Sequence, residues 1–397
     1  MITRSMRPFF KFCSILAPLF AFCGMGKCQS PGITDKEILI GSCAALEGPS
    51  SFLGREMVTG AEAYFQLINE EGGVNGRKLR LLSFDDGYDP AKAQACWEKL
   101  MAHKVFAMGF FVGTPTAVKY VPLAERDKVP LIGLFTGAQT LYAPLRHWVI
   151  NVRASYGDET KEQIEGLWST LHYRKIGVIY PDDAFGDTVL LGVQTALRGK
   201  GAGPVAASSY ARQTNEVEAA IEKLRAANAD AVVVVGAANT VAPIVKQAHE
   251  KGWRPLFVTV SFVGTDELIQ EAGPDAEGMV ITQVVPPYYL TDLKTVAQYR
   301  KALQEYAPSA RPNFVSLEGF VDGMVLVEGL KKAGRELTRE KLIDAIESLH
   351  DVELGLGYEL KLNYSAKSHK GFDRVIPTVI RGGRAVPFTD WTVVASK

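Results

Sequence analysis

The sequence of 397 residues lacks an excess of either charge, because 44 lysines and arginines are matched by 44 aspartates and glutamates. It also lacks basic runs with aromatic residues interleaved between them. A chain without these features has little with which to neutralise a phosphate backbone, so the sequence argues against nucleic acid as a partner. The composition, 47% hydrophobic and 22% charged, is that of a globular protein. Its length predicts two lobes.

Catalytic motifs are missing as well. The chain has no G-x-x-x-x-G-K-[ST], no G-x-G-x-x-G after its first strand, no H-E-x-x-H and no G-x-S-x-G. Its five cysteines and six histidines show no C-x-x-C and no metal-ligand spacing, so we expect neither a metal nor another cofactor. An exported hydrolase is a less favoured alternative. Its nucleophile would be Ser42 or Ser261. Its general base would be His147 or Asp266, but no motif joins them.

A strongly apolar run lies at the N-terminus. The stretch from 12 to 22 is almost wholly apolar. It follows three basic residues, Arg4, Arg7 and Lys11, and small residues come after it. This is the pattern of a secretory signal peptide over residues 1–30, with an apolar core about half as long as a membrane-spanning helix requires. We therefore expect a periplasmic protein. Removal of the signal peptide takes away four basic residues and no acids, which leaves 40 against 44.

Cysteine is scarce in the predicted mature chain. Lipid anchoring at Cys23 or Cys28 has weak support, because a phenylalanine and a lysine precede them where a small residue is expected. Only Cys43 and Cys96 follow the predicted signal peptide. In an oxidising compartment they could pair, or they could be two buried small apolar side chains. The sequence leaves both interpretations open.

After Pro31, short apolar runs alternate with amphipathic stretches. The first series has apolar runs at 37–41, 78–84, 105–111, 129–134 and 147–153, with helical patterns at 55–71, 90–103 and around 118–124. The second has apolar runs at 175–180, 204–210, 231–236, 256–260 and 279–284, with helical patterns at 188–199, 216–227 and 241–251. This alternation predicts an α/β fold of two doubly wound lobes, each a largely parallel sheet covered by helices.

Three helical patterns then follow one another, at 294–306, 314–334 and 338–349, before short strand-like runs over 353–397. A lobe built from 34–150 alone would leave one face of its sheet uncovered. The helical block can cover that face only if the chain returns to the first lobe. We therefore expect the chain to cross between the lobes more than once.

Two strand-to-helix turns carry hydroxyl groups beside backbone donors. Gly113-Thr114-Pro115-Thr116 opens one helix, and Leu134-Phe135-Thr136-Gly137-Ala138 follows the next strand. Ligands of open α/β sheets bind beyond the carboxyl ends of the strands, where helix N-termini present unpaired N–H groups. The two turns are therefore candidates for holding a carboxylate, although each threonine taken singly could be an N-cap. The run from Asp85 to Pro90 lacks the spacing of a calcium loop and predicts a turn.

Further motifs run through the whole mature chain in order: Ile40-Gly41, Leu46-Glu47-Gly48-Pro49, Gly54, Thr59-Gly60-Ala61-Glu62, Asn69 to Gly76, Asp85-Asp86 with Asp89 to Ala93, Tyr180 to Gly186, and Gly371-Phe372. Together they resemble the periplasmic leucine/isoleucine/valine-binding protein family. The resemblance implies a type I periplasmic binding protein, with two Rossmann-like lobes joined by a three-crossover hinge. Lobe 1 would comprise 31–151 and 286–372, and lobe 2 would comprise 152–285 and 373–397. Such proteins are non-catalytic monomers that deliver a solute to an inner-membrane ABC permease.

The resemblance also implies a ligand site in the cleft between the lobes. The residues that would hold the ligand carboxylate are Gly113, Thr114, Phe135, Thr136 and Gly137. The residues that would line the cleft walls are Leu53, Phe185 and Phe314, with ring surface added by Tyr156 and Tyr288.

One position departs from the family. The acidic residue that pairs with the ammonium group of an amino acid falls near Ser261 in this chain. A buried ammonium group without a counter-charge costs several kcal/mol. The departure favours a carboxylate without the amine, an aromatic acid or an amide. Asp182, Asp183 or Asp266 could supply the charge instead, with turn and cap roles as their alternative.

The sequence therefore predicts an exported solute-binding protein of a branched-chain-amino-acid-type ABC importer. Its ligand would be a small hydrophobic amino acid or a related carboxylate. Two alternatives stay open, namely a binding protein for aromatic acids or amides and a periplasmic ligand sensor that reports to a membrane receptor.

Overall fold

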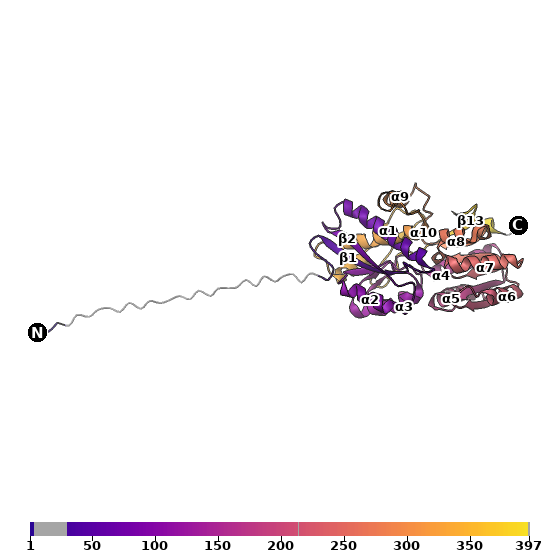
Figure 1. The fold of residues 1–397 in the computed structure, drawn as a ribbon, viewed down its shortest axis with the longest axis horizontal. Helices are drawn as coiled ribbons and strands as arrows, with labels where there is room; N and C mark the ends of the chain where they lie inside the picture. Colours follow the sequence, from indigo (N-terminus) through magenta and orange to yellow (C-terminus); the bar gives the residue numbers. More distant parts are fainter. Residues whose placement is uncertain (4–29, 213, 396–397) are drawn as a thin grey trace.

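The computed structural model describes residues 1–3, 30–212 and 214–395. From residue 30 onward the chain forms two α/β lobes that lie side by side (Figure 1). The predicted signal peptide, with its cysteines at 23 and 28, lies almost wholly outside the described residues.

The first lobe is built on a five-stranded parallel sheet in the order β2-β1-β3-β4-β5. Its strands are β1 (Glu37–Ala44), β2 (Lys78–Asp85), β3 (Ala107–Gly109), β4 (Leu131–Ile132) and β5 (Val149–Ile150). The helices interleaved with them are α1 (Ser51–Glu70), α2 (Ala93–Ala102) and α3 (Thr114–Asp127). The same lobe receives three later helices, α9 (Lys294–Tyr306), α10 (Phe314–Ala333) and α11 (Arg339–Glu347).

The second lobe is built on a seven-stranded sheet in the order β14-β13-β10-β9-β8-β6-β7. Its parallel strands are β6 (Ile176–Pro181), β7 (Ala207–Tyr210), β8 (Ala231–Val234), β9 (Leu256–Val260) and β10 (Val280–Gln283). Two further strands complete one side of this sheet, β13 (Ile376–Arg381), which pairs antiparallel with β10, and β14 (Arg384–Pro387), which pairs antiparallel with β13. Its helices are α4 (Tyr156–Glu165), continued by the π-helical η2 (Gly166–Thr170), α5 (Ala184–Arg198), α6 (Glu218–Ala226), α7 (Ala238–Glu250) and α8 (Thr265–Ala272).

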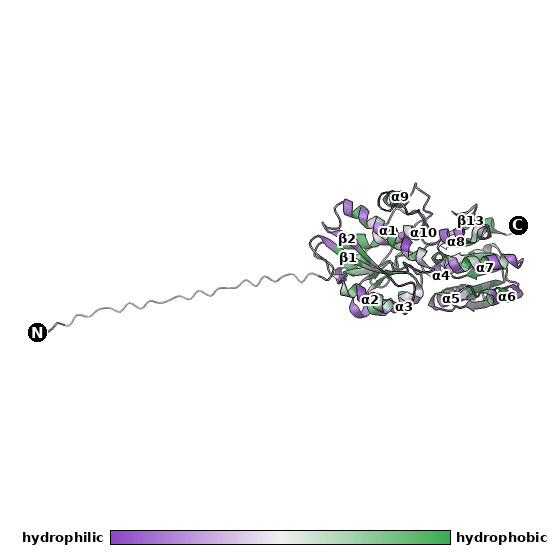
Figure 2. Ribbon diagram, viewed as in Figure 1, coloured by the Kyte–Doolittle hydropathy of each residue, from purple (hydrophilic) through white to green (hydrophobic). Residues whose placement is uncertain are grey.

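Short elements complete the chain. They are the two-stranded sheet of β11 (Val352–Glu353) and β12 (Lys361–Leu362) and the 3₁₀ turns η1 (Gln139–Leu141), η3 (Ser261–Val263), η4 (Gly273–Ala276) and η5 (Trp391–Val394). Figure 2 shows hydrophobic residues gathered on β1 and alternating hydrophobic and hydrophilic residues along surface helices such as α1 and α7. Among the described residues, no helix is both long and apolar enough to cross a membrane.

The chain passes between the lobes three times. The connections run from β5 to α4, from β10 to α9 and from β12 to β13. The expected return of the helical block is therefore present. The expected lobe boundaries, after residues 151, 285 and 372, fall within these connections, and the exact division of the chain stays a prediction.

Helix α10 is the element that covers the open face of the first sheet. It is buried along nearly its whole length, and most of its residues are apolar or glycine. It crosses α1 closely through two glycines. A Cβ on Gly60 would lie 1.8 Å from the Ser316 carbonyl oxygen, and one on Gly319 would lie 2.2 Å from the Met57 carbonyl oxygen. This crossing allows helix α10, from a distant part of the chain, to complete the first lobe beside α1 (Figure 1).

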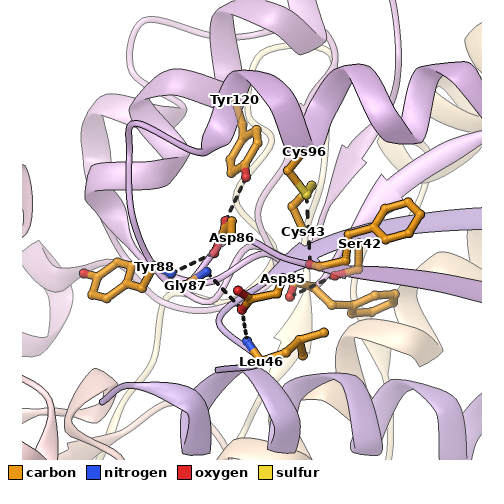
Figure 3. The surroundings of a disulfide bond; sticks show 11 residues. Ser42, Cys43, Leu46, Asp85, Asp86, Gly87, Tyr88, Cys96 and Tyr120 are labelled. Atoms are coloured by element: carbon orange, nitrogen blue, oxygen red, sulfur yellow. Dashed lines mark hydrogen bonds between the residues drawn. A yellow bond between two sulfur atoms is a disulfide. The ribbon is translucent and has the colours of Figure 1, made fainter. Parts of the chain in front are cut away.

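A disulfide joins β1 to α2 (Figure 3). Cys43 and Cys96 are bonded, with 6.2 Å between their Cα atoms. Both side chains are buried, so the interpretation as two free thiols is wrong, although their burial was correctly expected. The pairing is consistent with an oxidising compartment.

The aspartate-rich run after β2 forms a turn. Asp85 Oδ1 accepts hydrogen bonds from the backbone N–H groups of Leu46, Glu47 and Gly87 (Figure 3). Its neighbour Asp86 accepts from the N–H of Tyr88 and from a buried tyrosine hydroxyl. Across the described residues, no group of three or more histidine, cysteine, aspartate and glutamate side chains is arranged to hold a metal ion.

Two helices were not expected from the sequence, α4 and α8. The start of α4 carries a recognisable signal, because Ser155 and Asp158 form a capping box at its N-terminus. Helix α8 has only eight residues and begins after a glycine, so its periodicity is too short to detect.

Candidate functional site

Two buried threonines meet at the carboxyl edge of the first sheet. Thr114 begins α3 after β3, and Thr136 follows the neighbouring strand β4. Their hydroxyl oxygens lie 2.7 Å apart, and both side chains are fully buried. The turn before Thr114 requires a glycine, because Gly113 has φ of 88° and a Cβ there would lie 1.8 Å from the ring of Tyr88. The sequence therefore brings the two predicted hydroxyls together with α3's N-terminus.

Aromatic rings from both lobes pack beside the threonines. Phe262 lies at the centre of this group, with its ring centroid 5.3 Å from Phe135, 4.6 Å from Phe185 and 5.8 Å from Tyr88. Tyr156 lies 5.2 Å from Phe185. Phe135, Tyr156 and Phe185 were expected here from the sequence. Tyr88 and Phe262 were missed, because both lie in turns and nothing in their spacing shows that the turns meet.

The cleft between the lobes is closed around these rings. A cavity of about 30 Å³ remains, which is room for one or two water molecules. It is lined by Ser50, Tyr88, Pro181, Asp183, Phe185, Tyr210, Arg212, Gly236, Ala237, Asn239, Thr240 and Phe262. A solute of amino-acid size can enter only if the lobes separate or the rings move apart.

Ser261 occupies the position where the family has an acid, and an acid reaches it from another element. Glu159 on α4 accepts hydrogen bonds from the Ser261 N–H at 2.7 Å and from the Ser261 hydroxyl at 3.0 Å. Thr282 on β10 donates to the same carboxylate at 2.7 Å. Burial raises the pKa of Glu159, and the neighbouring Arg153 partly offsets this rise. Glu159 is fully buried and was not expected here from the sequence.

Arg153 is the cation of this region and was also missed. Its Nη1 lies 3.2 Å from Glu318 Oε1 and its Nη2 lies 3.4 Å from Glu159 Oε1. Nη2 also donates to the hydroxyl of Ser261, and the guanidinium lies over the ring of Phe135 at 5.0 Å. Burial alone would lower the pKa of Arg153, but attraction to the two glutamates raises it. The available signal in the sequence was the position of this arginine at the end of the apolar run at 147–153, where burial of a charge is expected.

Two of the three aspartates considered as substitutes for the missing acid have partners of their own. Asp183 caps α5 by accepting from the N–H groups of Phe185 and Gly186, and it pairs with Arg212 Nε at 3.0 Å. Its capping role agrees with the alternative expected from the sequence. Arg212 also donates a hydrogen bond to the backbone carbonyl of Tyr88 in the other lobe, and its guanidinium carbon lies 4.4 Å from the centroid of the Tyr88 ring.

Asp266 makes a different set of contacts. It accepts from the hydroxyl of Tyr288 at 2.7 Å and, across the lobes, from the N–H of Phe314 at 3.2 Å. Burial raises its pKa to about 6, an increase that these two hydrogen bonds moderate. Asp182, the third candidate, is exposed.

The remaining predicted wall residues lie against the start of α8. Leu53 is fully buried and lies where a Cβ on Gly264 would be 2.9 Å from its side chain. Phe314 packs edge-on to Tyr288 at 5.3 Å. Gly137 lies against α4, since a Cβ there would be 2.7 Å from the Tyr156 nitrogen. The structure thus places all the predicted residues at the facing surfaces of the two lobes, and their role in ligand binding stays a prediction.

A larger groove of 670 Å³ lies between α4 and α5. None of the predicted site residues lines it. Its walls include Ile164, Leu191 and Ala196.

The serines considered for hydrolysis have other partners. Ser42 donates to the Phe110 carbonyl at 3.5 Å, and Ser261 bonds Glu159 and Arg153. His147 bonds Glu340 at 2.8 Å. These contacts give no support to a nucleophile and base pair.

Comparison with known proteins agrees with this architecture. Residues 37–380 match the sequence profile of a family described as periplasmic binding protein. An amino acid binding protein from Pseudomonas aeruginosa is 25% identical over 273 residues, which are 67% of this chain and 72% of that protein.

Solved structures extend the agreement to three dimensions. A possible leucine/isoleucine/valine-binding protein from Rhodopirellula baltica SH 1 has a TM-score of 0.86 and 32% identity, covering 91% of this chain and 98% of that chain. A branched chain amino acid ABC transporter from Thermus thermophilus with bound valine shares the fold, with a TM-score of 0.80 and 20% identity over 90% of this chain and 97% of that chain. The expected resemblance and the two-lobed α/β fold are confirmed, and the chain belongs to the periplasmic binding protein family.

Proposed function

We propose that this protein is the exported solute-binding component of an ABC importer and that it binds a small hydrophobic amino acid or a related carboxylate between its lobes. The observation that carries the proposal is the pair of buried threonine hydroxyls at the N-terminus of α3, enclosed by aromatic rings from both lobes. The names of the relatives, which include an amino acid binding protein, support the same class of ligand.

The chemistry of this arrangement suits a carboxylate with an apolar group. Threonine hydroxyls and the free N–H groups of a helix start can hold a carboxylate without a buried cation. The rings of Phe135, Phe185 and Phe262 supply apolar walls. Closing the lobes brings both kinds of contact to the ligand together, so binding energy can favour the closed arrangement.

A second candidate is an aromatic or other acid without an amine. Two acids beside the cleft are already matched by arginines, since Glu159 faces Arg153 and Asp183 faces Arg212. An incoming ammonium group would therefore meet neutralised carboxylates there. Binding of an amino acid would rest on Asp266, whose hydrogen-bond donors are a hydroxyl and a backbone N–H.

A thermal-shift screen of residues 31–397 separates these candidates. The probes are leucine, valine and phenylalanine, the corresponding acids without the amine, and small amides. A ligand at about a hundred times its Kd adds about 2.7 kcal/mol of stability, which raises the melting temperature measurably. A shift with leucine or valine supports an amino acid ligand. A shift only with amine-free acids or amides supports the second candidate. No shift with any probe contradicts the proposal.

The threonine pair gives the mutational test. Removing either hydroxyl by Thr114→Ala or Thr136→Ala should weaken binding of the best probe by about 1–2 kcal/mol, because each change leaves a carboxylate hydrogen bond unmade. Isothermal titration calorimetry measures the loss. The control is Thr114→Ser, which keeps the hydroxyl and should keep most of the affinity. Wild-type affinity in both alanine variants would remove the pair from the site.

Delivery to an inner-membrane ABC permease, action as a monomer and the absence of catalysis are parts of the same proposal. They are supported by the family and by the binding-protein names of its members. A periplasmic ligand sensor is the remaining alternative. Cross-linking in intact cells, followed by identification of the captured membrane protein, distinguishes a permease from a receptor.

A further inference from the structure

We propose that Arg153 is a positioning residue that ties the two lobes together when they close, and that closure takes up a proton at the neighbouring carboxyl groups of Glu318 and Asp322. The inference rests on the proposed function in one respect, namely that the lobes open and close around a solute. It assigns a role to a buried charged cluster, hereafter the hinge cluster, that consists of Arg153, Glu159, Glu318 and Asp322.

The hinge cluster lies where the chain first crosses between the lobes. Arg153 belongs to the connection from β5 to α4. One of its acids, Glu318, is on α10 of the first lobe, and the other, Glu159, is on α4 of the second. The guanidinium and both carboxylates are almost completely buried, with side-chain exposures of 2%, 4% and 0%. One arginine thus spans the two lobes with an ion pair to each.

Each acid is fixed within its own lobe. Glu159 accepts from Ser261 on η3 and Thr282 on β10, which are both part of the second lobe. Glu318 precedes Gly319, whose backbone packs directly against Met57 of α1 in the first lobe. Neither acid can follow Arg153 when the lobes move apart. Separation must therefore lengthen at least one of the two ion pairs.

The charges of the hinge cluster do not balance when all groups are ionised. Three carboxylates face one guanidinium, and the other titratable groups near them are the hydroxyls of three tyrosines, Tyr142, Tyr156 and Tyr364. Buried charges without counter-charges are costly, so surplus carboxylates are expected to be protonated. The surplus acids are Glu318 and Asp322, because Glu159 has both oxygens occupied by hydrogen bonds.

Burial raises the pKa of both surplus acids and so favours their protonated forms. It raises the pKa of Glu318 to about 7, and the attraction of Arg153 only partly opposes the rise. It raises the pKa of Asp322 well above its ordinary value, and the charge of Glu318 adds to the effect. Asp322 is tightly enclosed, since a Cβ on Gly133 would lie 2.7 Å from its Oδ2. Burial and the repulsion between the two carboxylates therefore favour a proton shared by the Glu318 and Asp322 pair in the closed arrangement.

The sign of the pH dependence follows from these pKa values. When the lobes separate, water reaches Glu318 and its pKa falls toward its ordinary value. The closed arrangement then binds more protons than the open one, so it is favoured at low pH and loses this advantage as the pH rises through about 7. For one linked proton, the Kd of a solute that binds the closed arrangement should rise by up to about tenfold per pH unit as the pH approaches 7 from below, and it should level off above that pH.

The first experiment needs no solute. Small-angle scattering of residues 31–397 at pH 5.5 and pH 8.5 should give a larger radius of gyration at pH 8.5. Glu318→Gln, which mimics the protonated acid, should give the same radius at both values. Arg153→Met should be expanded at both, and Arg153→Lys should restore part of the closure. The matched control is Glu328→Gln on the same helix, where the acid is paired with Lys331 at the surface.

The second experiment measures Kd against pH by calorimetry with two probes, L-leucine and 4-methyl-2-oxopentanoate, which share a side chain and differ in the amine. Wild-type Kd should rise about tenfold between pH 6 and pH 8.5, with most of the rise below about pH 7.5, and Glu318→Gln should flatten the profile. Failure of both probes to bind contradicts the proposed function for this ligand class and leaves the scattering result to decide on the hinge cluster. Binding with a pH-independent Kd and radius, or an unchanged pH profile in Glu318→Gln, overturns the inference.

Discussion

Asp86 shows how a single buried carboxylate can tune the stability of this protein. It is fully buried in the turn after β2, and it accepts from the Tyr88 N–H at 2.9 Å and the Tyr120 hydroxyl at 2.8 Å (Figure 3). Burial raises its pKa to about 6, more than these two hydrogen bonds lower it. Its contribution to stability is therefore complete below about pH 4 and declines as the pH rises through about 6.

This shift predicts the behaviour of Asp86→Asn. The amide can accept from the same backbone N–H and carries no charge. The free energy of unfolding of the variant relative to wild type should rise by up to about 3 kcal/mol between pH 4 and pH 7.5. Urea unfolding at the two pH values measures it, with the exposed Asp35→Asn as control. A difference that stays constant with pH would show that Asp86 keeps an ordinary pKa in the folded protein.

Only part of the site is predictable from single residues. Thr114 and Thr136 could be found, because a hydroxyl at a strand-to-helix turn is a local pattern and parallel strands bring such turns to one edge. Arg153 and Glu159 could not be paired from the sequence, because their shared partner Ser261 is more than a hundred residues away. A local pattern carries no information about which distant turn it will meet.

At the scale of elements, the disulfide between β1 and α2 should contribute to stability. Cys43 and Cys96 enclose a segment of 53 residues, for which loop-closure entropy gives about 4 kcal/mol. The double variant Cys43→Ala/Cys96→Ala should lose about 2–4 kcal/mol in urea unfolding. Dithiothreitol should lower the midpoint of wild type and leave that of the variant unchanged. A wild-type midpoint insensitive to the reductant would contradict a stabilising role.

Element prediction succeeded where periodicity was strong and local. The fully buried β8 was recognisable as a central strand from its run of valines, and α10 from its long apolar pattern. Helix α4 was missed because Tyr156 and Ile164 are the only large apolar residues in it, too few to form an apolar stripe. Its contacts with the second sheet are made instead by the polar side chains of Glu159 and Gln163. Its capping box was the available signal.

At the scale of the whole molecule, the closed cleft predicts a change of shape on binding. The cavity lined by Tyr88, Phe185 and Phe262 between the lobes measures about 30 Å³, so entry of a solute there requires opening. At pH 7, saturating solute should lower the radius of gyration measured by small-angle scattering, because it favours closure. Thr114→Ala should need a higher solute concentration for the same decrease. An unchanged radius under saturating solute would count against closure as the binding mechanism.

The sequence by itself determined the α/β class, the repeated lobe pattern, the return of the late helices and the two threonine turns. Each of these depends on local periodicity or on the topology of parallel strands, which a linear pattern records. Only the tertiary structure decided that Cys43 bonds Cys96, that Phe262 packs between the lobes, and that Glu159 of the hinge cluster accepts a hydrogen bond from Ser261. Those contacts join residues far apart in the chain, and they form only when two separate lobes and three crossings fix where each turn lies.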